Sequence, residues 1–168
     1  MSTGLASGEA PRAITDADIA ALLALNNAHA TELSWQSPEA FSRLLAQACF
    51  ARTAGEAEAL LIALDQTADY DNPNFAWLAA RYPRFVYIDR IVVAEALHGR
   101  GLARGLYAAL IRFAAAHGHT HLVCEINLDP PNPASLALHV ALGFSAVGQA
   151  TLDNGKTVAY FHRPLSPG

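Results

Sequence analysis

Residues 85–105 read FVYIDRIVVAEALHGRGLARG and set the architecture of this chain. The first nine letters are mostly β-branched and aromatic, which predicts a strand over Phe85–Val93. The glycine-rich letters that follow open a helix predicted over Gly101–His117, with leucines recurring on one face. A strand that passes through a short turn into a long helix is typical of α/β proteins.

The segments before and after residues 85–105 predict further strands and helices, which alternate irregularly along the chain. Phe75–Tyr82 could be a short helix or an ordered loop, and the Asn-Gly pair at 154–155 is a strong hairpin signal. The middle of the chain therefore predicts parallel pairing and its end predicts antiparallel pairing. Strands are predicted over Pro11–Thr15, Glu58–Asp65, Thr120–Asn127, Phe144–Leu152 and Lys156–Pro164, and further helices begin at Thr15, Ser37 and Pro133.

Length and composition limit the class of protein. The 168 residues are 52% hydrophobic and 15% charged, which excludes a disordered chain and predicts one domain over residues 11–168 after a flexible tail of residues 1–10. Eleven basic residues against fifteen acidic ones argue against a nucleic-acid partner. The opening residues do not read as a secretory signal, and apolar runs are short, so we expect a cytoplasmic protein without a membrane partner.

The turn at residues 98–104 has the chemistry of a phosphate site. Glycines let the backbone approach a ligand closely, and the first N–H groups of a helix attract anions. Arg100 and Arg104 could add positive charge there. The alternative is a tight turn that binds nothing. A P-loop is excluded at this turn because residues 98–104 hold no Gly-Lys-Ser/Thr triplet, and Arg104 stands where a dinucleotide fingerprint needs its third glycine.

This turn resembles the acetyl-CoA pyrophosphate loop of the GNAT superfamily of N-acetyltransferases. The family pattern Arg/Gln-x-x-Gly-x-Gly/Ala falls on His98–Ala103, where His98 departs from the usual first residue. Residues 132–144 are similar to a second family segment, which runs from an Asn to a Gly-Phe pair. The strings YDNPNF, YIDRIVV and EINLDPPNP look like a bacterial subgroup of acetyltransferases. The resemblance implies a GNAT-like α/β fold, a central mixed sheet of about six to seven strands flanked by about four helices.

The resemblance also implies a reaction. An acetyl group would move from acetyl-CoA directly to a primary amine of a small-molecule or peptide acceptor, with a homodimer left open. Two alternatives remain: a CoA-binding regulatory or sensor module without turnover, and a plain structural domain. The residues expected to bind the cofactor are Ile91, Val92, Val93, His98, Gly99, Arg100, Gly101, Leu102, Ala103, Arg104, Asn132 and Ser135.

Two carboxylates are candidates for the base that deprotonates the amine. Asp89 and Glu125 each interrupt an apolar strand, where a carboxylate is expensive unless it is paired or faces a cleft. We expect both to face one cleft and to hold the amine. One alternative is that Asp89 forms a structural salt bridge with Arg90, Arg84 or another Arg. Another is a base that acts through water.

The remaining candidates are polar and aromatic side chains near these strands. His139 stands where the family often has a Tyr that protonates the leaving thiolate, with Tyr107 as a second candidate and simple packing as the alternative. No metal is expected, because the alternating histidines 117, 119 and 121 begin at a helix end and should not share a direction. The expected substrate-binding residues are Asn26, His29, Tyr70, Asn74, Phe75, Tyr87 and Asn127.

Overall fold

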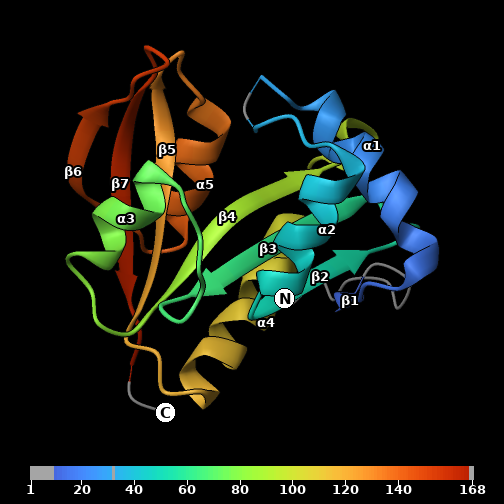
Figure 1. Cartoon of the computed structure of the whole chain (residues 1–168). Helices are drawn as coiled ribbons and strands as arrows, with labels where there is room; N and C mark the ends of the chain where they lie inside the picture. Colours follow the sequence, from blue (N-terminus) through green and yellow to red (C-terminus); the bar gives the residue numbers. More distant parts are fainter. Residues whose placement is uncertain (1–9, 32, 167–168) are drawn as a thin grey trace. The chain divides into compact units, whose positions relative to one another are not determined.

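The computed structural model describes residues 10–31 and 33–166 (Figure 1). The predicted tail therefore lies outside the described residues except for Ala10. The described chain divides into two compact units. The first unit holds the residues up to Leu64 together with Asp89–Phe113, and the second holds Asp65–Ile88 together with the residues from Ala114 onward. A single domain over residues 11–168 stays a prediction.

The strands form a mixed seven-stranded sheet, which confirms the predicted α/β fold. Its order is β1-β2-β3-β4-β5-β7-β6. β4 pairs with β5 in parallel, whereas β7 pairs with both β5 and β6 in the antiparallel sense, as the mixed element order predicts. The bounds are Arg12–Ala13 for β1, Phe50–Ala54 for β2, Ala59–Asp65 for β3, Phe85–Val93 for β4, His121–Asp129 for β5, Ser145–Thr151 for β6 and Thr157–Pro164 for β7.

Within the described residues there are five α-helices, one more than the approximate number expected. The additional helix is α3, in the segment that the sequence left open between helix and loop. The Asn72 side chain accepts hydrogen bonds from the backbone N–H groups of Asn74 and Phe75, and Pro73 takes the first helical position. None of the helices in the part of the chain that the structure describes is long and apolar enough to cross a membrane. Their bounds are Ile19–Ala28 for α1, Pro38–Gln47 for α2, Pro73–Ala79 for α3, Leu102–Ala116 for α4 and Pro133–Ala141 for α5.

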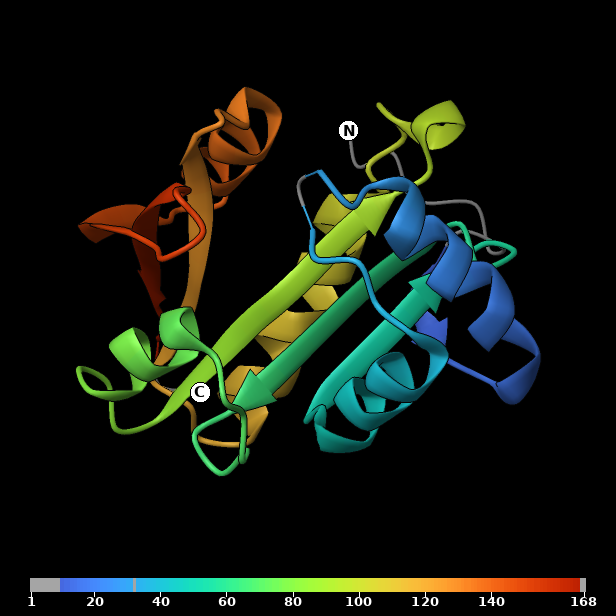
Figure 2. The same cartoon turned by 45° about the horizontal axis from the view of Figure 1, so that its top comes forward.

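The first unit contains a strand that the sequence analysis missed. β2 is short and carries Arg52 and Thr53, so its letters lack a clear apolar alternation. It is nevertheless paired along its whole length with β3, and the Thr53 hydroxyl donates to the Ala59 carbonyl at 2.7 Å. Figure 2 shows α1 and α2 in front of β2 and β3, with the first part of α4 behind them. Tertiary pairing, rather than local propensity, makes this segment a strand.

In the second unit, register brings polar and aromatic residues onto one face of the strands. Tyr87 on β4 lies opposite Val123 on β5, and Tyr160 on β7 lies opposite Glu125 on β5. Because alternate residues of a strand share a face, Tyr87, Glu125 and Tyr160 point to the same side. Phe75 of α3 covers this side, with its ring 5.5 Å from the Tyr87 ring.

Candidate functional site

The turn between β4 and α4 has the backbone of an anion-binding loop. Gly99 and Gly101 have φ angles of 85° and 79°, in the left-handed region that favours glycine. The Gly105 N–H donates to the Gly101 carbonyl at 2.9 Å and makes the first helical hydrogen bond. The N–H groups of Leu102–Arg104 thus precede that bond, at the positive end of α4.

The side chains of this turn fit a phosphate ligand. The exposed His98 ring donates through Nε2 to the Val93 carbonyl at 2.9 Å, so the residue that departs from the family pattern fastens the turn to the end of β4. A Cβ atom built on Gly99 would meet nothing within 4 Å, which leaves open space beside the backbone. Arg100 and Arg104 are exposed. Backbone, space and charge therefore fit a pyrophosphate.

Asp89 lies just before the predicted cofactor residues Ile91–Val93, and it is held by Arg90. Arg90 Nε lies 2.7 Å from Asp89 Oδ2, and both side chains are only 3% exposed. This confirms the structural salt bridge that the sequence left as an alternative for Asp89. The Arg90 guanidinium also donates to Asn26 Oδ1 at 2.7 Å and to the Ser34 hydroxyl at 3.2 Å. The chain itself thus supplies the cationic partner of Asp89.

Two expected substrate residues hold the end of α1. Asn26 is fully buried, and its side-chain amide donates to the Ser34 carbonyl at 3.0 Å. The His29 ring donates through Nδ1 to the Leu25 carbonyl at 3.0 Å. Asn26 therefore connects Arg90 to the segment that follows α1, and its buried amide does not face solvent.

Glu125, in the second unit, gathers several of the expected substrate residues around it. The Tyr87 hydroxyl donates to both carboxylate oxygens, at 2.9 and 2.7 Å. The Tyr160 hydroxyl donates to Asn74 Oδ1 at 2.9 Å. Tyr70 adds a ring 6.5 Å from that of Tyr87. The structure thus brings a carboxylate together with aromatic rings, a combination suited to binding a cation.

The negative charge of Glu125 affects the pKa values of residues on both sides of its strand. Burial raises the pKa of Tyr160, and the negative charge of Glu125 raises it further. Burial also raises the pKa of the Cys124 thiol, with Glu125 as the second cause. Glu125 is itself half-buried, and charges at partly buried positions are screened less by salt than charges at the surface.

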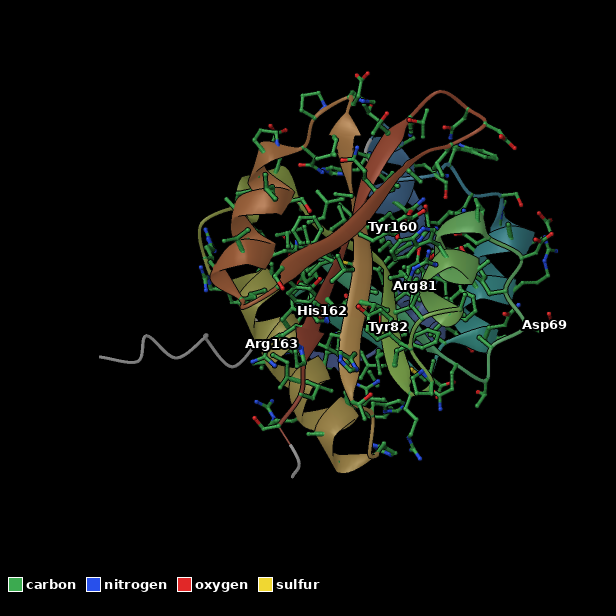
Figure 3. The ribbon with its side chains drawn as sticks, turned by 90° about the vertical axis from the view of Figure 1, so that its left-hand side faces the viewer. Asp69, Arg81, Tyr82, Tyr160, His162 and Arg163 are labelled. Atoms are coloured by element: carbon green, nitrogen blue, oxygen red, sulfur yellow. The ribbon has the colours of Figure 1, made fainter. Side chains whose placement is uncertain are left out.

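A stack of three side chains, which the sequence analysis missed, holds α3 against this face. The Trp77 ring lies on the Tyr160 ring with centroids 4.0 Å apart, and the Arg81 guanidinium lies 3.4 Å from the centre of the Trp77 ring. Figure 3 labels Tyr160 and His162 of β7, with Arg81 and Tyr82 near that strand. The alternation of β7 indicates which of its residues share a face with Tyr160, but the register that sets Tyr160 opposite Glu125 comes only from the tertiary structure.

Gly148 on β6 makes room for this stack. A Cβ atom there would lie 2.6 Å from Trp77 Cζ2, and the Trp77 ring cannot yield easily between Tyr160 and Arg81. We expect Gly148→Ala to lower the free energy of unfolding by about 1–3 kcal/mol, measured by urea denaturation. The same change in a Trp77→Leu background should cost much less. An equal loss in both backgrounds would show that the contact with Trp77 is not the cause.

His139 is buried in the second unit. Asn132 caps α5 by accepting from the Ser135 N–H at 3.2 Å, and His139 Nδ1 donates to the Ser135 carbonyl at 2.7 Å. The His139 ring is set edge-on to Phe144, with centroids 5.1 Å apart. Burial lowers the pKa of His139. In the neutral ring the proton therefore sits on Nδ1, and Nε2 can only accept.

Two of the alternating histidines meet different partners. His119 Nε2 lies 3.6 Å from Asp65 Oδ2, whereas the His121 ring is stacked on His162 with centroids 5.5 Å apart. Among the residues that the structure describes, no group of three or more His, Cys, Asp or Glu could hold a metal ion. Tyr107 is fully buried on α4, and Asn127 lies half-buried on the same face of β5 as Glu125.

Comparison with known proteins agrees with this picture. Residues 24–144 match the model of the acetyltransferase (GNAT) family. No curated protein sequence matches the chain.

Solved structures share the fold at low sequence identity. The ribosomal-protein-S18-alanine N-acetyltransferase of Escherichia coli is 17% identical with a TM-score of 0.69, covering 95% of this chain and 96% of that one. Ard1 from Thermoplasma volcanium is 11% identical with a TM-score of 0.74, covering 95% and 99%. A chain of the NatC complex bound to Gag peptide and CoA is 16% identical with a TM-score of 0.69, covering 93% and 98%.

Proposed function

We propose that this chain, which belongs to the acetyltransferase (GNAT) family, is an acetyl-CoA-dependent N-acetyltransferase that acts on a primary amine. The observation that carries the proposal is the turn before α4, with left-handed backbone at Gly99 and Gly101 and open space beside Gly99. The N–H groups of Leu102–Arg104 hold the pyrophosphate, with Arg100 and Arg104 at its edge. Bound there, acetyl-CoA supplies an activated acetyl group. The CoA-bound structural relative supports this choice of cofactor.

Glu125 holds the acceptor in this proposal. An amine arrives as a cation, and a carboxylate among aromatic rings attracts it. The cationic amine loses one proton to Glu125, and the neutral nitrogen forms a bond to the acetyl carbon as the carbon–sulfur bond of the thioester breaks. The nitrogen releases its second proton to water as the amide forms. Asp89 is less suited to this task, because Arg90 already binds its carboxylate at 2.7 Å. Asp89 instead positions Arg90 and, through it, the segment after α1.

The acceptor is a small molecule or a peptide with a primary amine. The names of two structural relatives support a peptide amine, since one acts on an alanine of ribosomal protein S18 and one was solved with the Gag peptide. The decisive experiment measures thiol release from acetyl-CoA over a panel of amines and peptides, with mass spectrometry of the acetylated product. CoA binding without thiol release for any acceptor would favour the alternative, a CoA-binding sensor module. No thermal shift with CoA would leave only a structural domain.

His139 remains a proposed donor of the proton that the leaving thiolate takes up. Donation requires the imidazolium form, and burial lowers the pKa of His139 below its usual value near 6.5. The imidazolium fraction therefore falls as pH rises through that lowered value. We expect His139→Gln to lower kcat by a factor that grows as pH falls below that usual value and that approaches one at alkaline pH, where neutral His139 cannot donate. If the ratio of wild-type to variant kcat does not change with pH, His139 does not donate the proton to the thiolate.

A further inference from the structure

The hydroxyl of Tyr87 occupies one particular side of the Glu125 carboxylate. Its distances to the two oxygens are 2.9 and 2.7 Å, which are nearly equal. A group almost equidistant from both oxygens lies near the bisector of the carboxylate. Tyr87 is fully buried, and Phe75 is set edge-on to its ring at 5.5 Å. The hydroxyl is therefore a fixed part of the carboxylate's surroundings.

The bisector is the approach that separates two classes of cationic ligand. A guanidinium binds a carboxylate through two parallel N–H bonds, one to each oxygen, and so straddles the bisector. An ammonium is a compact charge whose N–H groups donate one at a time, and it can reach either oxygen from its outer side. A hydroxyl held on the bisector obstructs the first geometry and permits the second.

Tyr160 is a natural control for Tyr87. It lies directly opposite Glu125 on β7 and is as deeply buried as Tyr87. Its hydroxyl, however, donates to Asn74 Oδ1 at 2.9 Å. Removing either hydroxyl deletes one oxygen from a buried tyrosine beside Glu125, but only the Tyr87 hydroxyl occupies the bisector.

We propose that Tyr87 is a specificity-determining residue that makes Glu125 a receptor for a single alkylammonium group and excludes guanidinium compounds. The inference rests on the proposed role of Glu125 in holding the acceptor. It narrows the acceptor class to primary alkylamines, such as lysine-like side chains and peptide amino termini, and leaves out arginine-like groups. The specificity arises from an obstruction to the wrong ligand as well as from attraction to the right one.

The test compares two cations with the same tail, n-butylamine and n-butylguanidine. Binding of each probe is measured by isothermal titration calorimetry at pH 7 with saturating CoA. We expect the wild-type protein to bind butylamine at least about tenfold more tightly than butylguanidine. Tyr87→Phe should gain butylguanidine affinity by about tenfold and lose the preference, because the obstructing hydroxyl is then absent. Tyr160→Phe should keep the wild-type preference.

Three results would overturn the inference: equal wild-type affinities for the two probes, no binding of either probe, or an unchanged preference in Tyr87→Phe. Equal wild-type affinities would overturn the inference even where a variant does not fold. Acetylation of butylamine is measured in the same samples. A wild-type preference without acetylation counts against the proposed function and leaves the inference on Tyr87 standing. Acetylation of butylamine without the preference would support the proposed function and overturn the inference on Tyr87.

A pH profile separates this role from a merely structural one. A hydrogen bond to a carboxylate stabilises its charged form, so loss of the Tyr87 hydroxyl makes Glu125 take up a proton at higher pH. The acidic limb of kcat/KM should therefore move to higher pH in Tyr87→Phe and stay in place in Tyr160→Phe. A uniform loss of activity at every pH would indicate that Tyr87 only supports packing, and would count against the inference.

Discussion

Replacing Glu125 with Gln should lower kcat by about 100-fold or more, while the thermal shift produced by CoA stays close to that of the wild type. Gln has nearly the shape of Glu and can still accept from the Tyr87 hydroxyl, which donates at 2.7 Å to one carboxylate oxygen. It cannot take a proton from an amine, and general base catalysis contributes typically 100- to 10,000-fold, so the loss falls on turnover. Steady-state kinetics at several pH values and a CoA titration measure the two effects.

Asp89→Asn is the matched control, because it changes the other mid-strand carboxylate in the same way. The buried Arg90 would lose its charged partner, since the two side chains lie 2.7 Å apart and are 3% exposed. Breaking a buried pair by removing one partner costs about 3–5 kcal/mol, so this variant should lose stability rather than show a specific defect in turnover. The proposed roles would be contradicted if the Asp89→Asn protein were stable with a 100-fold lower kcat while the Glu125→Gln protein stayed active. Asp89 would then be the base, and Glu125 would not.

Gly101→Asp should abolish the thermal shift caused by CoA. A ligand at a hundred times its Kd stabilises the folded protein by about 2.7 kcal/mol, so the wild-type shift is readily measured. The substitution places a negative charge beside the N–H groups of Leu102–Arg104, where the pyrophosphate is proposed to lie. The φ angle of 79° adds strain for any residue other than glycine.

Gly101→Asn isolates the charge from the strain. Asn and Asp have similar shape and both tolerate left-handed backbone better than other residues, so they should strain the turn alike. We expect the Asn variant to retain a measurable shift with CoA and the Asp variant to show none. Equal CoA affinities in the two variants would contradict a phosphate site at this turn.

The arrangement of the elements was largely predictable from local pattern. The strand before the glycine-rich turn, the long helix after it and the hairpin at Asn154-Gly155 all carry signals within a few residues, and the structure contains each of them. β2 was missed because its five residues have little strand character of their own and become a strand through pairing with β3. α3 was left undecided because Asn72 and Pro73 serve equally well to start a turn or a helix.

The sequence by itself determined the fold class, the position of the turn before α4 and the identity of the residues that could do chemistry, because these depend on order and spacing along the chain. Only the tertiary structure decided which partner each residue meets. It bound Asp89 to the adjacent Arg90 and connected Arg90 to Asn26, 64 residues away. It also set Tyr87 against Glu125 across 38 residues. Such partners are set by strand register and helix packing, which no local pattern of letters specifies.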